Sequence, residues 1–294
     1  MSLVSLVSRS GRPVRRGRVG WPVRIAVTAV CVLWAIPTAG TVITSFRTSQ
    51  AANSSGWWRA LITPFDTDQF TLLNYRFAWA GGMASSYLNS IAVTLPAVAL
   101  PVLLAAFAAY ALIFMRMPGA GVWYGLIVSL LIVPTLIALA PLLRLESEVG
   151  IVGTYAAAYL VHAAFGLPLA VLILCAYMAR LPRSILDSAA VDGASHWQTF
   201  WRLVMPLSVP ALAAVAVVQF VTVWNDLLVA LVFIGEGDHA PVTITLAGAV
   251  GGVGGQAPQF ASGAALIAVS APVIVFLALQ RYFVRGLTTG AIGG

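Results

Sequence analysis

The side chains that could perform chemistry are few and widely separated. The three histidines are His162, His196 and His239, and the nine acidic residues are spread along the whole chain. A membrane-embedded enzyme would need several His, Asp or Glu side chains around one cavity, and a metal site would need a similar group of ligands. These spacings provide neither. The chain is therefore predicted to hold no metal and not to be an enzyme.

Lysine is missing altogether, so all sixteen basic residues are arginines. A P-loop needs a Lys after its glycines to hold the phosphates of ATP, and a Schiff-base enzyme needs a Lys amine. We therefore expect the chain to bind no cofactor by itself.

The composition indicates an integral membrane protein. Apolar residues make up 60% of the chain and charged residues 9%, whereas soluble domains carry about 25% charged residues. The uncharged runs predict six transmembrane helices, because each is long enough to cross about 30 Å of hydrocarbon at 1.5 Å per residue. The expected spans are 25–46, 85–115, 122–143, 154–179, 204–234 and 260–283.

The expected fold class is all-α and polytopic. One transmembrane domain, 25–284, would lie between a basic N-terminal segment, 1–24, and a C-terminal tail, 285–294. The first apolar run is read as an uncleaved helix, because it is longer than the core of a signal peptide. The loops 47–84 and 235–259 would face away from the termini.

The arginines are distributed unevenly over the two sides of the membrane. With six spans both termini share one side, and Arg47, Arg59, Arg76 and Arg144 lie on the other. Positive residues accumulate on the cytoplasmic side. Both termini are therefore predicted to be cytoplasmic in a bacterial inner membrane, and the basic charge reflects topology, not nucleic-acid binding. The arginines on that side are Arg9, Arg12, Arg15, Arg16, Arg18, Arg24, Arg116, Arg180, Arg183, Arg202, Arg281 and Arg285.

A polar segment, 181–203, separates the fourth and fifth expected spans. A helix is predicted over 183–191 with Ser184 as its cap, a sharp turn at Gly193, and a second helix from His196. Glycine suits such a turn because it adopts positive φ without penalty. Two short helices meeting at a glycine would form a compact knob for a partner to approach. The alternative is an ordinary amphipathic connector on the membrane surface.

Several motifs resemble one family of membrane proteins. The order of Ala189-Ala190, Asp192-Gly193-Ala194, Phe200, Met205-Pro206-Leu207 and Pro210 is similar to the signature loop of ABC importer permeases. Over roughly 85–290 the chain resembles the binding-protein-dependent carbohydrate branch, and within it the smaller maltose-type permease subunit. The other matching motifs are Asn89-Ser90, Ala109-Tyr110-Ala111, Pro118-Gly119, Trp224-Asn225-Asp226, Gln280-Arg281-Tyr282-Phe283 and Gly286-Leu287-Thr288.

The resemblance implies a function and a set of partners. The chain would be the permease subunit of an ATP-driven importer for a carbohydrate, such as a di- or oligosaccharide. It would need a homodimeric ATP-binding subunit carrying ATP and Mg²⁺, a second permease subunit and an extracytoplasmic solute-binding protein, all at the lipid membrane.

The resemblance also makes 181–203 a cytoplasmic coupling-helix loop. In this role the loop would dock on the ATP-binding subunit and transmit its closure to the fourth and fifth spans. The family usually has Glu where this chain has Ser188, so Asp187 and Arg183 are the first candidates for the charged contact. The implied coupling residues are Arg183, Asp187, Ser188, Ala189, Ala190, Asp192, Gly193 and Ala194.

A second group of candidates lies in or near the spans. Asp226 is the one acid attached to a long apolar run, and an ionisable residue in a membrane is a functional candidate by default. With Trp224, Asn225 and Tyr155 it could form a substrate path or gate. The alternatives are a place for Asp226 at the outer interface and an anchoring role for the two aromatic residues.

The competing function is a secondary transporter driven by an ion gradient. Such a protein normally carries several ionisable residues along its membrane pathway. In the first four spans and the sixth, the only such ionisable residue is His162, which is itself more typical of a packing residue. The pattern therefore favours the ATP-driven importer.

Overall fold

The computed structural model describes residues 20–115, 117–251 and 257–291. Its α-helices are α1 (Trp21–Ser45), α2 (Ser49–Ser54), α3 (Arg59–Ile62), α4 (Leu73–Ala78), α5 (Ala84–Phe114), α6 (Ala120–Ser129), α7 (Thr135–Val149), α8 (Tyr155–Met178), α9 (Arg183–Val191), α10 (His196–Thr199), α11 (Met205–Leu207), α12 (Val209–Trp224), α13 (Val242–Gly251) and α14 (Pro258–Ala291). Short 3₁₀ or π segments join some of them: η2 (Thr67–Gln69), η3 (Trp79–Met83), η4 (Leu130–Ile132), η5 (Phe200–Val204) and η6 (Ala230–Ile234).

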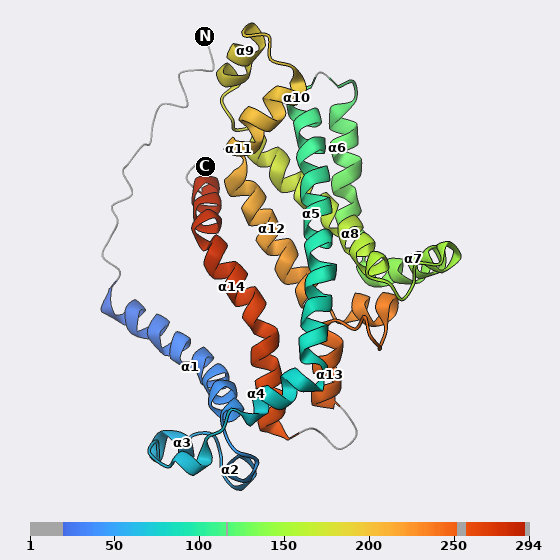
Figure 1. Ribbon diagram of the computed structural model, residues 1–294. Helices are drawn as coiled ribbons and strands as arrows, with labels where there is room; N and C mark the ends of the chain where they lie inside the picture. Colours follow the sequence, from blue (N-terminus) through green and yellow to red (C-terminus); the bar gives the residue numbers. More distant parts are fainter. Residues whose placement is uncertain (1–19, 116, 252–256, 292–294) are drawn as a thin grey trace.

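A bundle of α5, α8, α12 and α14 forms the body of the protein (Figure 1). Helix α5 packs most extensively on α8, and α12 packs on both α14 and α5. The helices α9, α10 and α11 lie at one end of the bundle, which we call the knob end. The segments α2, α3 and α4 lie at the other, which we call the cap end (Figure 1).

The all-α, polytopic fold expected from the sequence is confirmed. Four helical stretches are long and apolar enough to cross a membrane: Trp21–Ser45, Leu73–Phe114, Tyr155–Met178 and Pro258–Gln280. Two bent helix pairs raise the possible number of spans to six within the described residues.

The expected third span, 122–143, is one of these bent pairs. Helices Ala120–Ile132 and Thr135–Val149 meet at 101°, and α7 lies across the bundle axis instead of along it (Figure 1). The cause is Pro134, which is the N-cap of α7, because the residue before a proline is driven out of the helical region. Val133 accordingly has a ψ of 117°. The apolar run is continuous in sequence, but the helix axis changes direction within it.

The expected fifth span, 204–234, is broken at both ends. His196–Leu207 and Val209–Trp224 meet at 72°, with Ser208 fully buried at the bend. Pro206 and Pro210 flank this bend, and Pro210 lies in the first turn of α12, where its missing N–H breaks no internal hydrogen bond. Helix α12 then ends at Trp224, and η6 continues the chain after a break.

The C-terminal boundary also differs from the expectation. Helix α14 does not end near 283 but continues to Ala291, so residues 285–291 belong to this helix and are not a separate tail. Residues 1–19, Arg116 and 292–294 lie outside the described residues, and with them most of the basic N-terminal segment.

Small residues let the central helices approach closely. Ala105, Ala106 and Ala109 of α5 and Ala170 of α8 are fully buried. In membranes, helices associate chiefly through close packing, so small side chains favour such contacts. The α5–α8 pair therefore forms the most tightly packed part of the bundle and connects its two ends.

Candidate functional site

The knob, which we define as residues 183–199, is shaped by the turn that ends α9. Gly193 has a φ of 75°. Its N–H donates to the Ala190 carbonyl at 3.1 Å, and the Ala194 N–H donates to the Ala189 carbonyl at 2.9 Å. This pair of bonds is a Schellman motif, in which a residue with positive φ closes a helix C-terminus. The turn predicted at Gly193 is confirmed.

The second helix of the knob begins with a capping box. The Ser195 hydroxyl accepts from the Gln198 N–H at 3.3 Å, and the Gln198 side-chain oxygen accepts from the Ser195 N–H at 2.9 Å. Two backbone donors are thereby satisfied at the start of α10. The helix predicted from His196 is confirmed.

The predicted cap of the first helix is wrong. The N-cap of α9 is Pro182, and no side chain caps the helix. Ser184 already lies inside the first turn, because the extended backbone of Pro182 places the N-cap two residues earlier. The Ser184 carbonyl accepts instead from the Ser188 hydroxyl at 2.9 Å. Ser188 is thus hydrogen-bonded within α9, whereas Asp187 is exposed.

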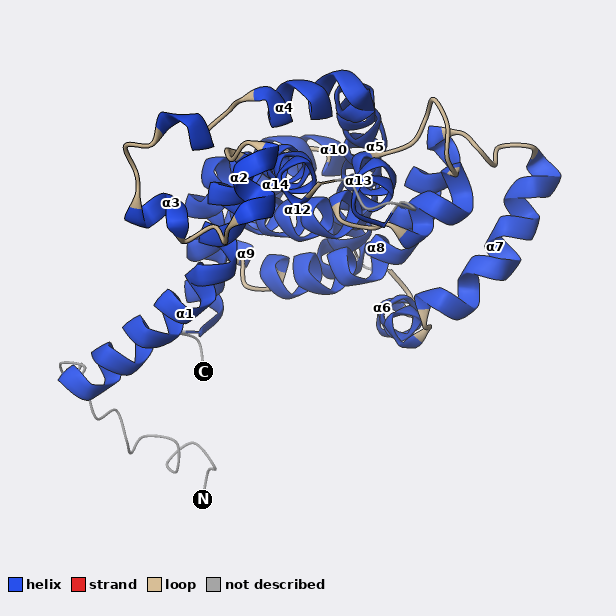
Figure 2. Cartoon of the chain, turned by 90° about the horizontal axis from the view of Figure 1, so that it is seen from below, coloured by secondary structure: helices blue, strands red, loops and turns tan. Residues whose placement is uncertain are grey.

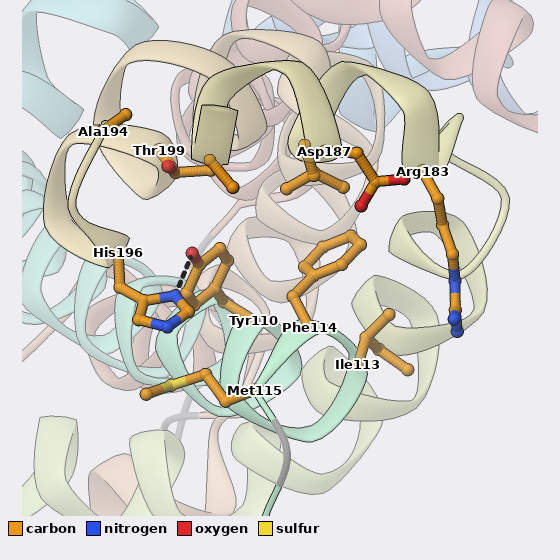
Figure 3. Close-up of a pocket in the computed structure, with 11 residues that line it drawn as sticks. Tyr110, Ile113, Phe114, Met115, Arg183, Asp187, Ala194, His196 and Thr199 are labelled. Atoms are coloured by element: carbon orange, nitrogen blue, oxygen red, sulfur yellow. Dashed lines mark hydrogen bonds between the residues drawn. The ribbon is translucent and has the colours of Figure 1, made fainter. Parts of the chain in front are cut away.

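Aromatic packing holds the knob on α5. Phe200 is buried beside Phe107, with ring centroids 4.7 Å apart. The Tyr110 hydroxyl and the His196 Nδ1 are hydrogen-bonded at 3.0 Å, as Figure 3 shows. Trp197 and Trp201 complete the cluster around Phe107. The knob is therefore tied to the second predicted span, a contact that the sequence did not suggest.

Two grooves flank α9, and all of the predicted coupling residues except Ser188 line one or the other. The first groove, about 510 Å³, separates α9 from the end of α5, and Arg183, Asp187, Ala190 and Ala194 contribute to its wall. Figure 3 shows Arg183 and Asp187 on its α9 side and Ile113, Phe114 and Met115 on its α5 side. The second groove, about 440 Å³, is lined by Ala189, Asp192, Gly193, Ala194, Gln198, Thr199, Arg202 and Leu203.

Two of the four candidates for a substrate path, Trp224 and Asp226, line one small cavity, whereas Asn225 and Tyr155 are not part of its lining. Trp224 is 3% exposed, stacks on Phe220 at 5.5 Å and donates its indole N–H to the Ala268 carbonyl at 2.9 Å. Asn225 is exposed and donates to the Val221 carbonyl at 2.8 Å, on its own helix. Both side chains are engaged within the chain, so their contact with a substrate stays a prediction.

Tyr155 belongs to a separate polar cluster at the cap end, which we call the clamp. Its hydroxyl donates to Asn89 Oδ1 at 2.7 Å. The Asn89 amide donates to the carbonyls of Asp238 at 2.8 Å and Ala240 at 3.1 Å. The Ser90 hydroxyl accepts from the Val242 N–H at 2.8 Å. The clamp, formed by Asn89, Ser90 and Tyr155, thereby fixes the loop 235–242 on α5 and α8.

Asp226 lies at the break between α12 and η6. One carboxylate oxygen accepts from the Val229 N–H at 2.9 Å, and the Asp226 carbonyl accepts from the Thr243 hydroxyl at 3.2 Å. Asp226 and His162 line the same small cavity, of about 10 Å³, which is room for about one water molecule. The predicted position at the outer interface and the predicted gate role both remain compatible with this placement.

The described residues contain no group of three or more His, Cys, Asp or Glu side chains that could hold a metal ion. What they present is a helical bundle with a shaped, exposed knob at one end and a hydrogen-bonded loop at the other. Together with the candidate membrane spans, these features are those of an integral membrane protein.

Comparison with known proteins establishes the family. Residues 71–289 match the model of the binding-protein-dependent transport system inner membrane component, and the chain belongs to this family. The protein is therefore a permease of the ABC importer class, as the motifs indicated, and the alternative of an ion-driven secondary transporter is not supported.

Three curated proteins illustrate the relationship. The osmoprotective compounds uptake permease protein GgtD of Synechocystis sp. is 42% identical over 92% of this chain and 91% of its own length. The alpha-glucoside transport system permease protein AglG of Rhizobium meliloti is 35% identical over 96% and 99%. The trehalose transport system permease protein SugB of Mycobacterium tuberculosis is 33% identical over 76% and 82%.

A solved structure has the same fold. A chain of a bacterial ABC transporter involved in the import of the acidic polysaccharide alginate superposes with a TM-score of 0.72 at 19% identity, over 91% of this chain and 99% of that one. A likeness at this identity concerns the fold alone.

Sequence reasoning missed the roles of Asn89, Tyr110 and Gln219. Asn89 and Tyr110 were noticed only as parts of family motifs, and their partners are distant in the chain. Gln219 is the one amide side chain in α12, so its place in an apolar helix was a usable signal. Its Nε2 is buried and has no hydrogen-bond partner in the described part of the chain.

Proposed function

We propose that this chain is the permease subunit of an ATP-driven, binding-protein-dependent importer of a carbohydrate, such as a di- or oligosaccharide or a related glycoside. The family supports the transport role. The names of two relatives, which refer to α-glucosides and trehalose, support the substrate class. The observation that supports this proposal most directly is the knob. A permease subunit whose ATP is bound by a partner needs an exposed surface on which that partner can dock and transmit its movement.

The knob would dock on a homodimeric ATP-binding subunit, where ATP and Mg²⁺ would be held. Its outer surface is open to a partner, since Val191 is 87% exposed and Trp197 64% exposed. Apolar side chains on an extramembrane surface favour a protein contact. Of the candidates Asp187 and Arg183, Asp187 offers an exposed acidic group next to Ser188, which stands at the position of the family's Glu and whose hydroxyl is bonded inside α9.

A displacement of the knob would reach the membrane through two connections. The aromatic cluster links it to α5, and the bend at Ser208 links it to α12. The Tyr177 hydroxyl of α8 donates to the Leu207 carbonyl at 3.1 Å, next to this bend. Closure of the ATP-binding subunits would therefore move α5, α8 and α12 together.

A second permease subunit would complete the translocation pathway. The cavity around Asp226 and His162 is too small for a sugar, because ligand pockets measure about 300–1,000 Å³ and it measures about 10 Å³. A cavity of about 390 Å³ between η4, α7 and α8 is larger but is lined only by apolar side chains. A sugar needs hydrogen-bonding groups, so the pathway would form between two permease chains.

The knob end would be cytoplasmic, and both termini with it, in the bacterial inner membrane. The arginine distribution supports this orientation. The C-terminal end of α14 also lies toward the knob end (Figure 1). The loop 235–242 at the cap end would then face an extracytoplasmic solute-binding protein, and Asp226 behind the clamp would act as a gate.

The test is transport by a reconstituted complex. The chain, its genomic neighbours encoding an ATP-binding subunit, a second permease and a solute-binding protein would be co-expressed, purified together and placed in liposomes. We expect uptake of trehalose or an α-glucoside that requires both internal ATP and the binding protein. Uptake that persists without ATP, or a chain that purifies alone in gentle detergent, would contradict the proposal.

A further inference from the structure

The cap, which we define as residues 47–72, is fixed rigidly to the end of α1. The Arg47 guanidinium is 2% exposed and donates to the carbonyls of Ser55 at 2.6 Å and Ala51 at 2.7 Å. The Asn74 amide donates to the carbonyls of Ser45 at 2.8 Å and Arg47 at 2.9 Å. Burial, and then the nearby charge of Arg59, lower the pKa of Arg47. The cap is thus held by a buried cation solvated by backbone carbonyls.

The cap also folds back along α1. A Cβ atom at Gly40 would lie 3.0 Å from the indole nitrogen of Trp57, so the Trp57 ring rests directly on this glycine. Gly40 precedes the end of α1 by five residues, about 7.5 Å along a helix. Helix α1 is a candidate membrane span. The segment that follows Trp57 therefore begins at the level where this span approaches the membrane surface.

That segment presents large apolar side chains outward. Trp58, Leu61, Ile62 and Phe65 are 58%, 63%, 74% and 94% exposed. They belong to α3 and its flanking residues, at the edge of the molecule and away from the bundle in both views (Figures 1 and 2). Such a cluster on a rigid extramembrane segment would be unfavourable in water and marks an interaction surface.

From these observations we propose that residues 58–65 are a membrane-interface anchor, lying in the headgroup region of the leaflet at the cap end. The patch contains Trp and Phe together with Arg59 and no acidic residue, which is the composition of segments that lie in the interface. Helix α1 also presents large apolar side chains outward, since Leu33 and Trp34 are 65% and 78% exposed.

Lipid fits this surface better than the solute-binding protein does. The patch lies beside α1, a candidate span whose apolar window is only 6% buried against the rest of the described chain, and the contact of Trp57 with Gly40 sets the depth of the patch. The acidic residues of the cap, Asp66 and Asp68, come only after Phe65. The proposal requires that α1 spans a membrane and is independent of the transported substrate.

The test is the environment of spin labels in the reconstituted complex. Cys31 and Cys175, the two free cysteines, would be replaced by Ala. Single Ile62→Cys and Phe65→Cys variants would carry a nitroxide, and Asn53→Cys on the water-exposed side of α2 would be the matched control. Collision with oxygen, which concentrates in lipid, would be compared with collision with a water-soluble nickel chelate. Co-purification of the ATP-binding subunit would confirm assembly of each variant.

We expect the oxygen-to-nickel collision ratio at positions 62 and 65 to exceed that at position 53 in liposomes. Equal ratios at all three positions would overturn the proposal. A decrease in nickel collision at positions 62 and 65 that arises only when the solute-binding protein is added would assign the patch to that protein instead. Low collision with both reagents at positions 62 and 65 would assign the patch to a contact with the second permease.

Discussion

The knob and the clamp hold non-helical chain at opposite ends of the bundle by different means. In the knob, backbone bonds around Gly193 set the shape, and the side chains on its outer surface are exposed. In the clamp, the side chains of Asn89, Ser90 and Tyr155 bond to the loop and to one another, and Asn89 is 8% exposed. The outer surface of the knob is therefore open, whereas the clamp is enclosed by its own hydrogen bonds.

This difference predicts different responses to substitution. The knob should tolerate changes of exposed side chains but not of its turn, because the turn alone orients both short helices. The clamp should respond to single side chains, because each removal leaves a buried polar group without its partner. The following substitutions test this contrast, beginning with the largest expected effect.

Gly193→Pro should abolish coupling. Proline fixes φ near −65° and has no N–H, whereas Gly193 has a φ of 75° and donates to Ala190. We expect membrane insertion to be normal and ATP hydrolysis to continue without uptake, measured side by side in liposomes. Gly150→Pro is the matched control, since Gly150 has a φ of 78° and closes α7 with the same pair of backbone bonds. Normal uptake by the Gly193 variant would contradict the role of the knob.

Asn89→Ala should destabilise the cap end. The change removes three hydrogen bonds and leaves the carbonyls of Asp238 and Ala240 unpaired. We expect a loss of about 2 kcal/mol in the free energy of unfolding, measured by thermal unfolding of the purified complex. Tyr155→Phe removes only one of these bonds and should lose about half as much. Equal, negligible losses in both variants would show that the clamp does not fix the loop.

Gly166→Ala tests the rigidity of the connection between the two ends. A Cβ at Gly166 would lie 1.6 Å from Gln219 Nε2, so the buried amide must leave its place between α8 and α12. We expect a loss of about 1–2 kcal/mol from overpacking, again by thermal unfolding. The double variant Gly166→Ala, Gln219→Ala should recover most of the loss. If the double variant is no more stable than Gly166→Ala, then Gly166 is needed for the backbone of α8 and not to make room for the Gln219 amide.

Asp187→Asn should have the smallest effect. An exposed ion pair contributes less than about 1 kcal/mol, so affinity for the ATP-binding subunit should fall by no more than about fivefold. Ser188→Ala should leave it unchanged, because that hydroxyl is bonded within α9. The measurement is titration of the ATP-binding subunit onto the permease in nanodiscs. A larger effect at Ser188 than at Asp187 would reverse the assignment of the charged contact.

The sequence predicted what local chemistry determines. The helix class follows from the uncharged runs, and the turn at Gly193 from the one residue type that accepts its φ. The helix breaks at Pro134 and Asn225 were not predicted. Each lies inside an apolar run, where the composition stays the same although the helix axis changes direction. The contacts of Tyr110 with His196 and of Asn89 with the loop could not be predicted, because each joins residues far apart in the chain.

The length of α14 has a mechanical consequence for the whole assembly. Its 34 residues make a rod of about 51 Å, and the hydrocarbon core is about 30 Å thick. Even when strongly tilted, the rod must therefore protrude from the bilayer toward the knob end. A partner docked on the knob would also contact the protruding end of α14. Movement of that partner would then rotate the permease helices as well as shift them.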